Sequence, residues 1–583
     1  MIAELSPNGD RIDVRFPYSP EAVRAAKSVP GARFVPADRG GPLWRYPLSL
    51  TSGRRLREAF GLGLVLGPEL TAWGTEAVRL ERNLGAISGA ESAELVRLPV
   101  EAPALYEFVS SRPYQTADIA MMAATNVLNA NQPGTGKTVE VLGAWVEAGL
   151  LRGRHLVVAP KSSLEVVWKA EIERFFPEAT VVVLSGSRKP TERALAAVLT
   201  ASEEGSGTRV LVTTPDALRS DSAGIGSVAW STCTIDEFHR FGLGNPKTKF
   251  AAALRRIRAE RKYALSGTPI GGKPIRMWGV LNWLEPNEYT SKWAWAESWL
   301  RISDNGFGKE IGGIVPGREG QFVEAHARHM VRRLKREALP GLPEKVRIEV
   351  APTMTPKQAQ AYEAFRRDLE VRLAAGDDGE ERVAAENVLA EFTRLKQFAN
   401  ALCEVDETGT VVPTGESGKL DELVERLDAE GIRRDDPVDG ARAIVASESR
   451  KFVEVVAARL RQAYGDAVDV DLLTGETGDD ERVRAVREFG SDDGRARVLV
   501  LTTTAGGVSL NLEAANSIHV LDETWNPDDT EQLEDRGDRG SRTEPLRVYL
   551  YRTKETIQEY VARVADGKTV TNRTVLDYVR QPR

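Results

Sequence analysis

Short apolar runs, each followed by a loop and often by an amphipathic stretch, occur in two separate blocks of this sequence. The runs are HLVVAP, TVVVLSG, RVLVTTP, CTIDE and YALSGTP in the first block, and ARAIVAS, VDVDLLTG, RVLVLTTT, SIHVLDE and LRVYLY in the second. Apolar runs that alternate with helical patterns are typical of strands in a parallel sheet whose faces are covered by helices. The sequence therefore predicts two α/β lobes in one chain.

The remainder of the chain divides at small, polar or acidic stretches, which are typical of loops and linkers. At 583 residues the chain is too long for a single hydrophobic core. A stretch with a helical pattern and three tryptophans, Trp293, Trp295 and Trp299, lies between the two blocks. The predicted divisions are a small N-terminal α+β domain (1–60), a linker (61–100), the first lobe (101–290), a helical insertion with an inter-lobe linker (291–415) and the second lobe (416–583).

The strongest local signal is a nucleotide-binding loop, NQPGTGKT at 131–138, which precedes the helical stretch VEVLGAWVEAGL. Glycines in such a loop let backbone N–H groups turn toward phosphate oxygens at a helix N-terminus. Lys137 is expected to reach the β- and γ-phosphates of ATP, and the Thr138 hydroxyl to bind Mg²⁺. Asn131 stands where the strict pattern has its first glycine, and for this segment alone a glycine-rich turn without a ligand is the alternative. The loop residues expected to bind ATP are Gly134, Thr135, Gly136, Lys137 and Thr138.

An apolar strand that ends in two carboxylates follows about one hundred residues later, in TCTIDEFH at 232–239. Asp236 is positioned to hold the metal through water, and Glu237 to orient and deprotonate the attacking water. The stretch ALSGTPI at 264–270 is another strand with hydroxyl groups at its end. The residues expected to couple the γ-phosphate to the rest of the motor are His239, Ser266 and Thr268. Either motif alone occurs by chance, so both predictions depend on the nucleotide-binding loop that precedes them.

Two arginines in the second block, Arg536 and Arg539 of EQLEDRGDRG, lie three residues apart. On a helix this spacing places both guanidinium groups on one face. An arginine supplied to a phosphoryl group during its transfer stabilises the developing charge. The sequence therefore predicts that the two lobes close on one ATP. A charged, solvated helix with intrahelical ion pairs is the alternative.

The order of these motifs resembles that of the Swi/Snf-related ATPases of helicase superfamily two, over about residues 105–565. The resemblance also rests on RPYQ, APKSSLEVVW, TTPDAL, MVRRLKRE, LTTTAGGVSLNL and WNP, which occur in the family's order. It implies two RecA-like lobes, a DNA-dependent ATPase activity, and duplex DNA as the partner. It further implies that Gln115 contacts the adenine and that Gln532 belongs to the ATP site. The residues that would line the DNA track are Lys161, Ser162, Thr213 and Thr214 on the first lobe, and Thr503 and Thr504 on the second.

The N-terminal residues resemble the HARP-type module that accompanies the motor in annealing helicases. The resemblance lies in Phe16, Tyr18, Phe34, Trp44, Tyr46 and Leu48. Residues 1–60 hold ten Lys and Arg against six Asp and Glu, a net charge of +4 inside a chain of net charge −7. A basic module of this kind implies binding to forked or branched DNA, although the same aromatic positions also fit the core of a small domain.

Composition argues against several other classes of protein. With 42% hydrophobic and 28% charged residues the chain falls among ordinary globular proteins. The sequence shows neither a signal-peptide pattern at its start nor an apolar window of roughly 18 residues, so we expect a cytoplasmic protein, of a bacterial or phage-infected cell. Cys233 and Cys403 do not form a disulfide framework. His326 and His329 share a helix face, and we expect them on the surface rather than in a zinc site.

Together these patterns predict an ATP- and Mg²⁺-dependent translocase on double-stranded DNA that remodels or reanneals branched structures. One alternative is a strand-separating helicase, which shares every ATPase motif. Another is a non-catalytic DNA-binding protein with a degenerate motor. The residues whose presence counts against a degenerate motor are Lys137, Asp236, Glu237, Arg536 and Arg539.

Overall fold

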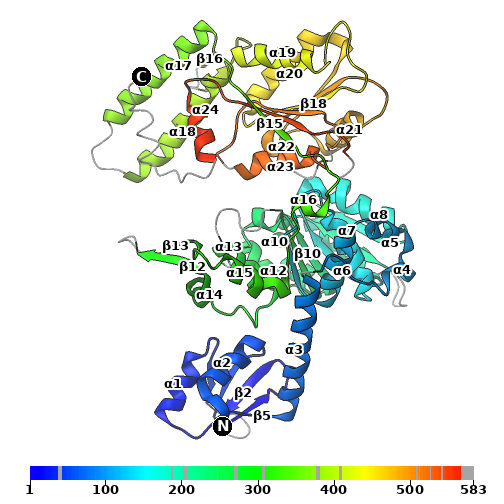
Figure 1. Ribbon diagram of the computed structural model, residues 1–583, viewed down its shortest axis with the longest axis vertical. Helices are drawn as coiled ribbons and strands as arrows, with labels where there is room; N and C mark the ends of the chain where they lie inside the picture. Colours follow the sequence, from blue (N-terminus) through cyan, green and yellow to red (C-terminus); the bar gives the residue numbers. More distant parts are fainter. Residues whose placement is uncertain are drawn as a thin grey trace. The chain divides into compact units, whose positions relative to one another are not determined.

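Two units make up the computed structural model, Met1–Leu339 and Pro340–Arg583, and Figure 1 shows their helices and strands. The structure describes residues 1–36, 42–88, 90–185, 188–200, 207–243, 245, 247–267, 274–304, 309–375, 381–405, 410–506, 510, 512–525, 527–539 and 542–565. No described helix is long and apolar enough to span a membrane.

The first unit begins with a five-stranded sheet in the order β3-β4-β2-β1-β5. Neighbouring strands are antiparallel except β1 and β5, which are parallel. Ile12 and Val14 point to the same face of the sheet and are buried in one cluster with Leu56 of α2. Ser19 and Ser49 begin α1 and α2 by accepting backbone N–H bonds. The elements are β1 (Ile2–Leu5), β2 (Arg11–Arg15), β3 (Arg33–Val35), β4 (Leu43–Pro47), β5 (Val65–Leu66), α1 (Pro20–Ser28), α2 (Leu50–Phe60) and α3 (Pro68–Ser88).

The segment 61–100, which the sequence predicts as a linker, is instead largely regular structure. It contains β5, which completes the N-terminal sheet, and the 21-residue helix α3. Leu70 of α3 packs in the N-terminal core, whereas Leu84 packs in the core of the following lobe. Apolar residues recur in α3 at the three- and four-residue spacing of a helix, so the sequence carries a stripe that the prediction of a linker overlooked. They are Leu70, Trp73, Ala77, Leu80, Leu84 and Ile87.

The first lobe is built on a seven-stranded parallel sheet in the order β14-β6-β11-β10-β7-β9-β8. Leu156 and Val158 belong to one hydrophobic cluster and Val157 to another, because successive strand residues point to opposite faces. Helices α6 and α7 cover one face, and α12 and α13 the other (Figure 1). The elements are β6 (Val127–Asn129), β7 (Arg154–Val158), β8 (Thr180–Leu184), β9 (Arg209–Thr213), β10 (Ala229–Asp236), β11 (Arg258–Leu265), β14 (Met330–Val331), α6 (Pro113–Ala124), α7 (Lys137–Glu147), α12 (Lys249–Leu254) and α13 (Ile275–Leu284).

The segment 291–415, predicted as a helical insertion and linker, contains strands as well as helices. After α14 (Lys292–Trp299), the strands β12 (Leu300–Asp304) and β13 (Lys309–Ile314) form an antiparallel pair. The chain then returns through α15 (Glu319–His326) to β14, which joins the first sheet. Beyond Leu339 the same segment belongs to the second unit.

His326 and His329, which we expected on a surface helix, are buried, with 1% and 7% of their surfaces exposed. The Trp295 indole donates to His326 Nε2 at 3.0 Å, and His326 Nδ1 lies 2.6 Å from the Phe322 carbonyl oxygen. Both nitrogens of His326 are therefore used inside the insertion, with the neutral ring donating from Nδ1 and accepting at Nε2.

The second unit is a six-stranded parallel sheet in the order β15-β22-β21-β18-β20-β19. Together with the first sheet it confirms the predicted pair of α/β lobes. Tyr362 of α17, Leu395 of α18 and Ile557 of α24 meet in one buried cluster. The elements are β15 (Val346–Val350), β18 (Arg442–Ser447), β19 (Asp469–Leu473), β20 (Arg497–Thr502), β21 (Ser517–Val520), β22 (Arg547–Tyr551), α17 (Pro356–Ala375), α18 (Glu381–Asn400), α19 (Gly418–Ala429), α20 (Arg450–Tyr464), α23 (Pro527–Gly537) and α24 (Ile557–Ala565).

A fully buried lysine, Lys419 at the start of α19, connects this helix with α18, with α24 and with the residue that follows β21. Its Nζ donates to Asn400 Oδ1 and to Gln558 Oε1, each at 2.8 Å, and also to the Leu521 carbonyl. Burial lowers the pKa of Lys419 to about 7. The Lys419 side chain therefore needs Asn400, which precedes it in the sequence, and also Leu521 and Gln558, which follow it by more than a hundred positions.

Candidate ATP site

The nucleotide-binding loop has the backbone geometry that its glycines predict. Gly134 and Gly136 have φ angles of +83° and +95°, a region that side chains rarely adopt. Gly136 also precedes the first residue of α7, and a Cβ there would lie 2.4 Å from Gln115 Nε2. Glycine at 136 is therefore required both for the backbone and for the close approach of Gln115.

The side chains of the loop are held by hydrogen bonds within the first lobe. Lys137 Nζ donates to the carbonyl oxygens of Asn131 and Gln132, at 2.9 and 3.3 Å. The Thr135 carbonyl accepts from Gln115 Nε2 at 3.0 Å, and the Thr135 side chain is buried. Lys137 and Thr138 form the first turn of α7, where N–H groups are free of helical partners and the helix dipole favours an anion.

Gln115 itself is fully buried beneath the loop. Its Oε1 has no hydrogen-bond partner among the described residues. The structure therefore brings Gln115 to the nucleotide-binding loop, and its expected contact with adenine stays a prediction.

Three motifs meet at one edge of the first sheet. The loop follows β6, the SGT motif follows β11 and the DEFH motif follows β10, and these three strands are neighbours in the order β6-β11-β10. All run parallel, so their carboxyl ends share the edge at which open α/β sheets bind ligands. Ser266 also donates its backbone N–H to the Asn129 carbonyl at 3.1 Å, which ties the end of β11 to the end of β6.

The DEFH motif makes a polar contact with the end of β11. His239 Nδ1 lies 2.8 Å from Ser266 Oγ and 3.4 Å from Glu237 Oε2. Asp236 Oδ2 accepts from the Trp168 indole at 3.1 Å. The structure thus brings together His239, Glu237 and Ser266, whereas Thr268 lies outside the described residues.

Glu237 has a positive φ angle of 49°, which among the described non-glycine residues is shared only with Glu555. A left-handed conformation at a residue other than glycine costs free energy and persists where the surrounding structure enforces it. Here the strand β10 ends at Asp236 and a short helical turn begins at Phe238. The two adjacent carboxylates make different contacts, Asp236 with the Trp168 indole and Glu237 with His239.

Mg²⁺ would be held by few protein groups at this site. Among the described residues, no three His, Cys, Asp or Glu side chains cluster closely enough to form a metal site. Mg²⁺ keeps several waters and binds through one or two protein oxygens and the phosphates of its nucleotide. Thr138 on α7 and Asp236 at the end of β10 fit this arrangement, and they remain the predicted metal-binding residues.

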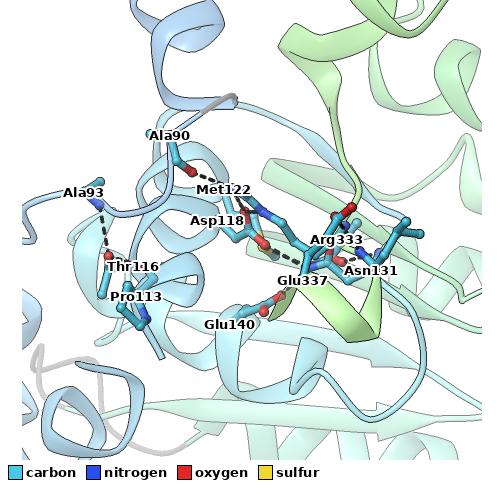
Figure 2. Close-up of polar contacts among 12 residues, drawn as sticks. Ala90, Ala93, Pro113, Thr116, Asp118, Met122, Asn131, Glu140, Arg333 and Glu337 are labelled. Carbon is cyan, nitrogen blue, oxygen red and sulfur yellow. Dashed lines mark hydrogen bonds and ion pairs between the residues drawn. The ribbon is translucent and has the colours of Figure 1, made fainter. Parts of the chain in front are cut away.

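Sequence reasoning missed a buried polar cluster under the loop, which Figure 2 shows. The Asn131 amide Nδ2 donates to Asp118 Oδ2 at 2.7 Å and to Glu140 Oε2 at 3.2 Å. The Arg333 guanidinium donates to Asp118 Oδ1 from Nε at 3.1 Å and from Nη2 at 2.9 Å. Burial raises the pKa of Glu140 well above its usual range, and the nearby Asp118 carboxylate raises it further. The sequence signals for this cluster are Asn131, in place of a glycine, and the MVRRLKRE stretch that contains Arg333, and neither indicates that the two residues meet.

The predicted DNA-track residues of the first lobe differ in their exposure. Lys161 is exposed in a short helical turn, and Ser162 beside it is half-buried. Thr213 is buried and donates to the Leu184 carbonyl at 3.1 Å, while Thr214 accepts from Ala217 N at 3.2 Å and caps α10 (Pro215–Ser220). The hydroxyls of both threonines are thus engaged within the lobe.

In the second unit, the predicted residues lie at β20 and α23. Thr503 is buried and Thr504 exposed directly after β20. Gln532 is 7% exposed within α23.

The prediction that Arg536 and Arg539 lie on one face of the same helix is wrong. Arg536 lies in α23, but the helix ends at Gly537 and Arg539 follows it. Arg539 Nη2 instead donates to the Leu510 carbonyl at 3.2 Å.

Two family models match this chain. The family model described as the SNF2-related domain matches residues 81–403, and the helicase conserved C-terminal domain matches residues 419–541. The ATP-dependent DNA helicase DDM1 of Arabidopsis thaliana is 26% identical over 474 residues, which are 77% of this chain and 59% of that protein. The putative ATP-dependent helicase/translocase YwqA of Bacillus subtilis is 26% identical over 454 residues, 77% of this chain and 46% of that protein.

The chain spans about half the length of the curated relatives that it matches. Among solved structures, the Sulfolobus solfataricus SWI2/SNF2 ATPase core in complex with dsDNA is 21% identical, covers 78% of this chain and 91% of that chain, and has a TM-score of 0.33. The SNF2-related model alone accounts for 323 of the 583 residues, from 81 to 403. This chain belongs to the SNF2-related family, as the order of its motifs indicates.

Proposed function

We propose that this protein is an ATP-hydrolysing motor that translocates along double-stranded DNA and remodels or reanneals forked and branched DNA. The observation that carries the proposal is the convergence of the loop, the SGT motif and the DEFH motif at the ends of β6, β11 and β10. Relatives named as an ATP-dependent DNA helicase and a helicase/translocase support DNA as the track.

ATP would bind at the N-terminus of α7. The N–H groups of the loop and the Lys137 ammonium would contact the phosphates, with Thr138 and Asp236 holding Mg²⁺. When bound, Mg²⁺ supplies positive charge that neutralises the phosphates and assists their transfer. Glu237 would orient the attacking water and accept its proton, and Arg536 and Arg539 of the second unit would stabilise charge on the γ-phosphoryl group.

His239 would connect hydrolysis to DNA. Its ring contacts both Glu237, which faces the attacking water in this proposal, and Ser266 at the end of the neighbouring strand. A change at the γ-phosphate that displaced Glu237 would therefore displace a hydrogen bond to the end of β11.

The N-terminal domain would recognise the fork. Tyr18 and Phe34 are 86% and 51% exposed, although most aromatic residues of this domain are partly or fully buried. Arg24 and Lys27 are exposed one turn apart on α1. Exposed aromatic rings favour stacking with unpaired bases, which a fork provides and a blunt duplex lacks, and exposed basic groups favour DNA phosphates.

The first test is steady-state ATP hydrolysis with no nucleic acid, single-stranded DNA, blunt duplex or forked DNA, with Lys137→Ala as the blank. We expect stimulation by duplex and the strongest stimulation by the fork. Hydrolysis at the Lys137→Ala level with every DNA would contradict a motor function.

A second assay separates translocation from strand separation. A translocase on duplex DNA should displace a third strand from a triplex while leaving a blunt-flanked duplex paired. Efficient unwinding of that duplex would favour the strand-separating helicase instead.

A further inference from the structure

Arg333 stands outside the catalytic motifs and yet contacts the nucleotide-binding loop. Its backbone N–H donates to Asn131 Oδ1 at 2.7 Å, and its carbonyl accepts from Gln132 N at 3.1 Å. Its guanidinium pairs with Asp118, whose side chain has no exposed surface, and Nη2 also donates to the Ala90 carbonyl at 2.9 Å. Figure 2 shows Arg333 with Asn131, Asp118 and Ala90.

Asn131 connects this arginine to the residue that would bind phosphate. Its side chain is held by Arg333 and Asp118, while its carbonyl oxygen accepts from Lys137 Nζ at 2.9 Å. Asn131 therefore accepts hydrogen bonds from the Arg333 backbone N–H and from the Lys137 ammonium group. A shift of Asn131 changes the position from which Lys137 reaches into the loop.

The chain around Arg333 also leads directly to the second unit. Val331 pairs with Asn129 in the first sheet, and Lys335 N donates to Gln132 Oε1 at 2.6 Å. The first unit ends at Leu339, six residues after Arg333. Residues 331–335 thus run beside residues 129–132 immediately before the chain crosses to the second unit.

We propose that Arg333 is a positioning residue for the nucleotide-binding loop, which it holds through Asp118 and Asn131 and connects to the segment leading into the second unit. In this proposal Arg333 does not contact the substrate. It acts by fixing the position of Asn131, whose carbonyl oxygen accepts from Lys137 Nζ. This inference rests on the proposed binding of ATP and gives a role to a residue of the MVRRLKRE stretch, to which the sequence assigned none.

The test compares full-length variants in nucleotide affinity without DNA, measured by fluorescence anisotropy of a labelled ATP analogue with Mg²⁺. Arg333→Met should weaken binding about ten-fold or more, because small displacements of binding groups have large effects. In steady-state hydrolysis with duplex DNA, KM for ATP should rise by more than kcat falls. Arg333→Lys, which keeps the ion pair but loses the forked contacts, should lie between the wild type and Arg333→Met.

Two further variants separate positioning from folding. Arg333→Met combined with Asp118→Asn removes both charges, so that no uncompensated carboxylate is left buried, and it should still bind ATP weakly. Arg45 and Asp13 form the matched control, since Asp13 is 2% exposed and accepts from Arg45 Nε at 2.7 Å, within the N-terminal sheet. Arg45→Met with Asp13→Asn should lower the melting temperature and leave ATP affinity unchanged.

Equal ATP affinity in the wild type, Arg333→Met and the charge-free double variant would overturn this inference alone. Equal losses of affinity in the Arg333 and Arg45 double variants would also overturn it, because they would report general destabilisation. Failure of the wild type to bind the analogue would overturn the proposed function together with the inference.

Discussion

At the scale of the residue, Asn131 explains why the nucleotide-binding loop departs from the strict pattern. Among the described residues it is not one of those with positive φ, so its backbone does not require glycine. Its side chain instead bonds Asp118, Glu140 and the Arg333 N–H. Asparagine in place of glycine at 131 therefore costs the loop no backbone conformation that it needs. Its side chain also provides a hydrogen-bond partner for three buried polar groups.

Asn131→Gly should therefore destabilise the protein even though it restores the strict loop pattern. Asp118 and Glu140 keep hydrogen bonds from Arg333 and Asn129, so the Arg333 backbone N–H is the group that loses its partner. A buried polar group left without a partner costs about 1–3 kcal/mol, and glycine adds up to about 1 kcal/mol of backbone entropy. We expect the free energy of unfolding to fall by about 2–4 kcal/mol in urea titrations. A glycine variant as stable as the wild type would show that the side chain of Asn131 contributes nothing.

The ATP-site residues were predictable because each motif is local in sequence, and the cluster beneath them was not. Gly134, Gly136 and Lys137 are adjacent along the chain, and strand patterns alone place Asp236 at a strand end. Arg333, in contrast, contacts Asp118 across 215 positions. No spacing rule relates residues so far apart.

At the scale of the element, the ten predicted strands are all present in the two parallel sheets. Within these two sheets, the strands that the sequence did not predict are short or exposed. β6 has three residues and β14 two, while four of the five residues of β15 are exposed or half-buried. Such segments lack the apolar run by which a buried strand is recognised, and only pairing with neighbours defines them.

The insertion should make the first unit sensitive to acid. Burial lowers the pKa of both His326 and His329 to about 4. Between pH 6.5 and 4 these rings are neutral in the folded state and protonated in the unfolded state, so stability is complete above pH 6.5 and is lost as pH falls. A protonated His326 could not accept from the Trp295 indole.

We expect the free energy of unfolding to fall by up to about 3 kcal/mol for each of these histidines as the pH is lowered toward 4. His326→Gln should reduce that pH dependence by the equivalent of one proton in urea titrations at several pH values. An unchanged pH dependence in this variant would show that His326 is not protected in the folded state.

The exposed aromatic residues of the N-terminal domain should affect the choice of DNA and not hydrolysis itself. Tyr18→Ala with Phe34→Ala should reduce the preference for forked over blunt duplex DNA, since each stacked base contributes about 1–3 kcal/mol. ATP hydrolysis stimulated by saturating blunt duplex should stay within about two-fold of the wild type. Leu62→Ala, at a residue that is 95% exposed in the same domain, is the matched control. Unchanged fork preference in the aromatic double variant would exclude these rings from recognition.

At the scale of the whole molecule, the unit Pro340–Arg583 and the matched helicase C-terminal domain, 419–541, have different limits. The unit includes β15, which pairs with β22, and Asn400, which bonds the buried Lys419. It also includes Tyr362, whose hydroxyl accepts from Ile557 N at 2.9 Å. A fragment that began at residue 419 would lack β15, Asn400 and Tyr362.

We expect the fragment 340–583 to unfold in a single cooperative transition, and the fragment 419–583 to lack one. In the shorter fragment the apolar face of α24 is exposed and the Lys419 ammonium group lacks Asn400. The free-energy cost of these two changes together exceeds the marginal stability of a small domain. Circular dichroism during urea titration is sufficient to compare them. A cooperative transition in 419–583 would show that residues 340–418 are dispensable for the fold.

The pairing of β15 with β22 also has a consequence for synthesis on the ribosome. Val346 aligns with Arg547, so β15 emerges about 200 residues before β22, the strand with which it pairs. At about 5–20 residues per second this is a delay of roughly 10–40 s. During that interval the first unit has its whole sequence available, whereas the second sheet cannot close until the last of its strands has been translated.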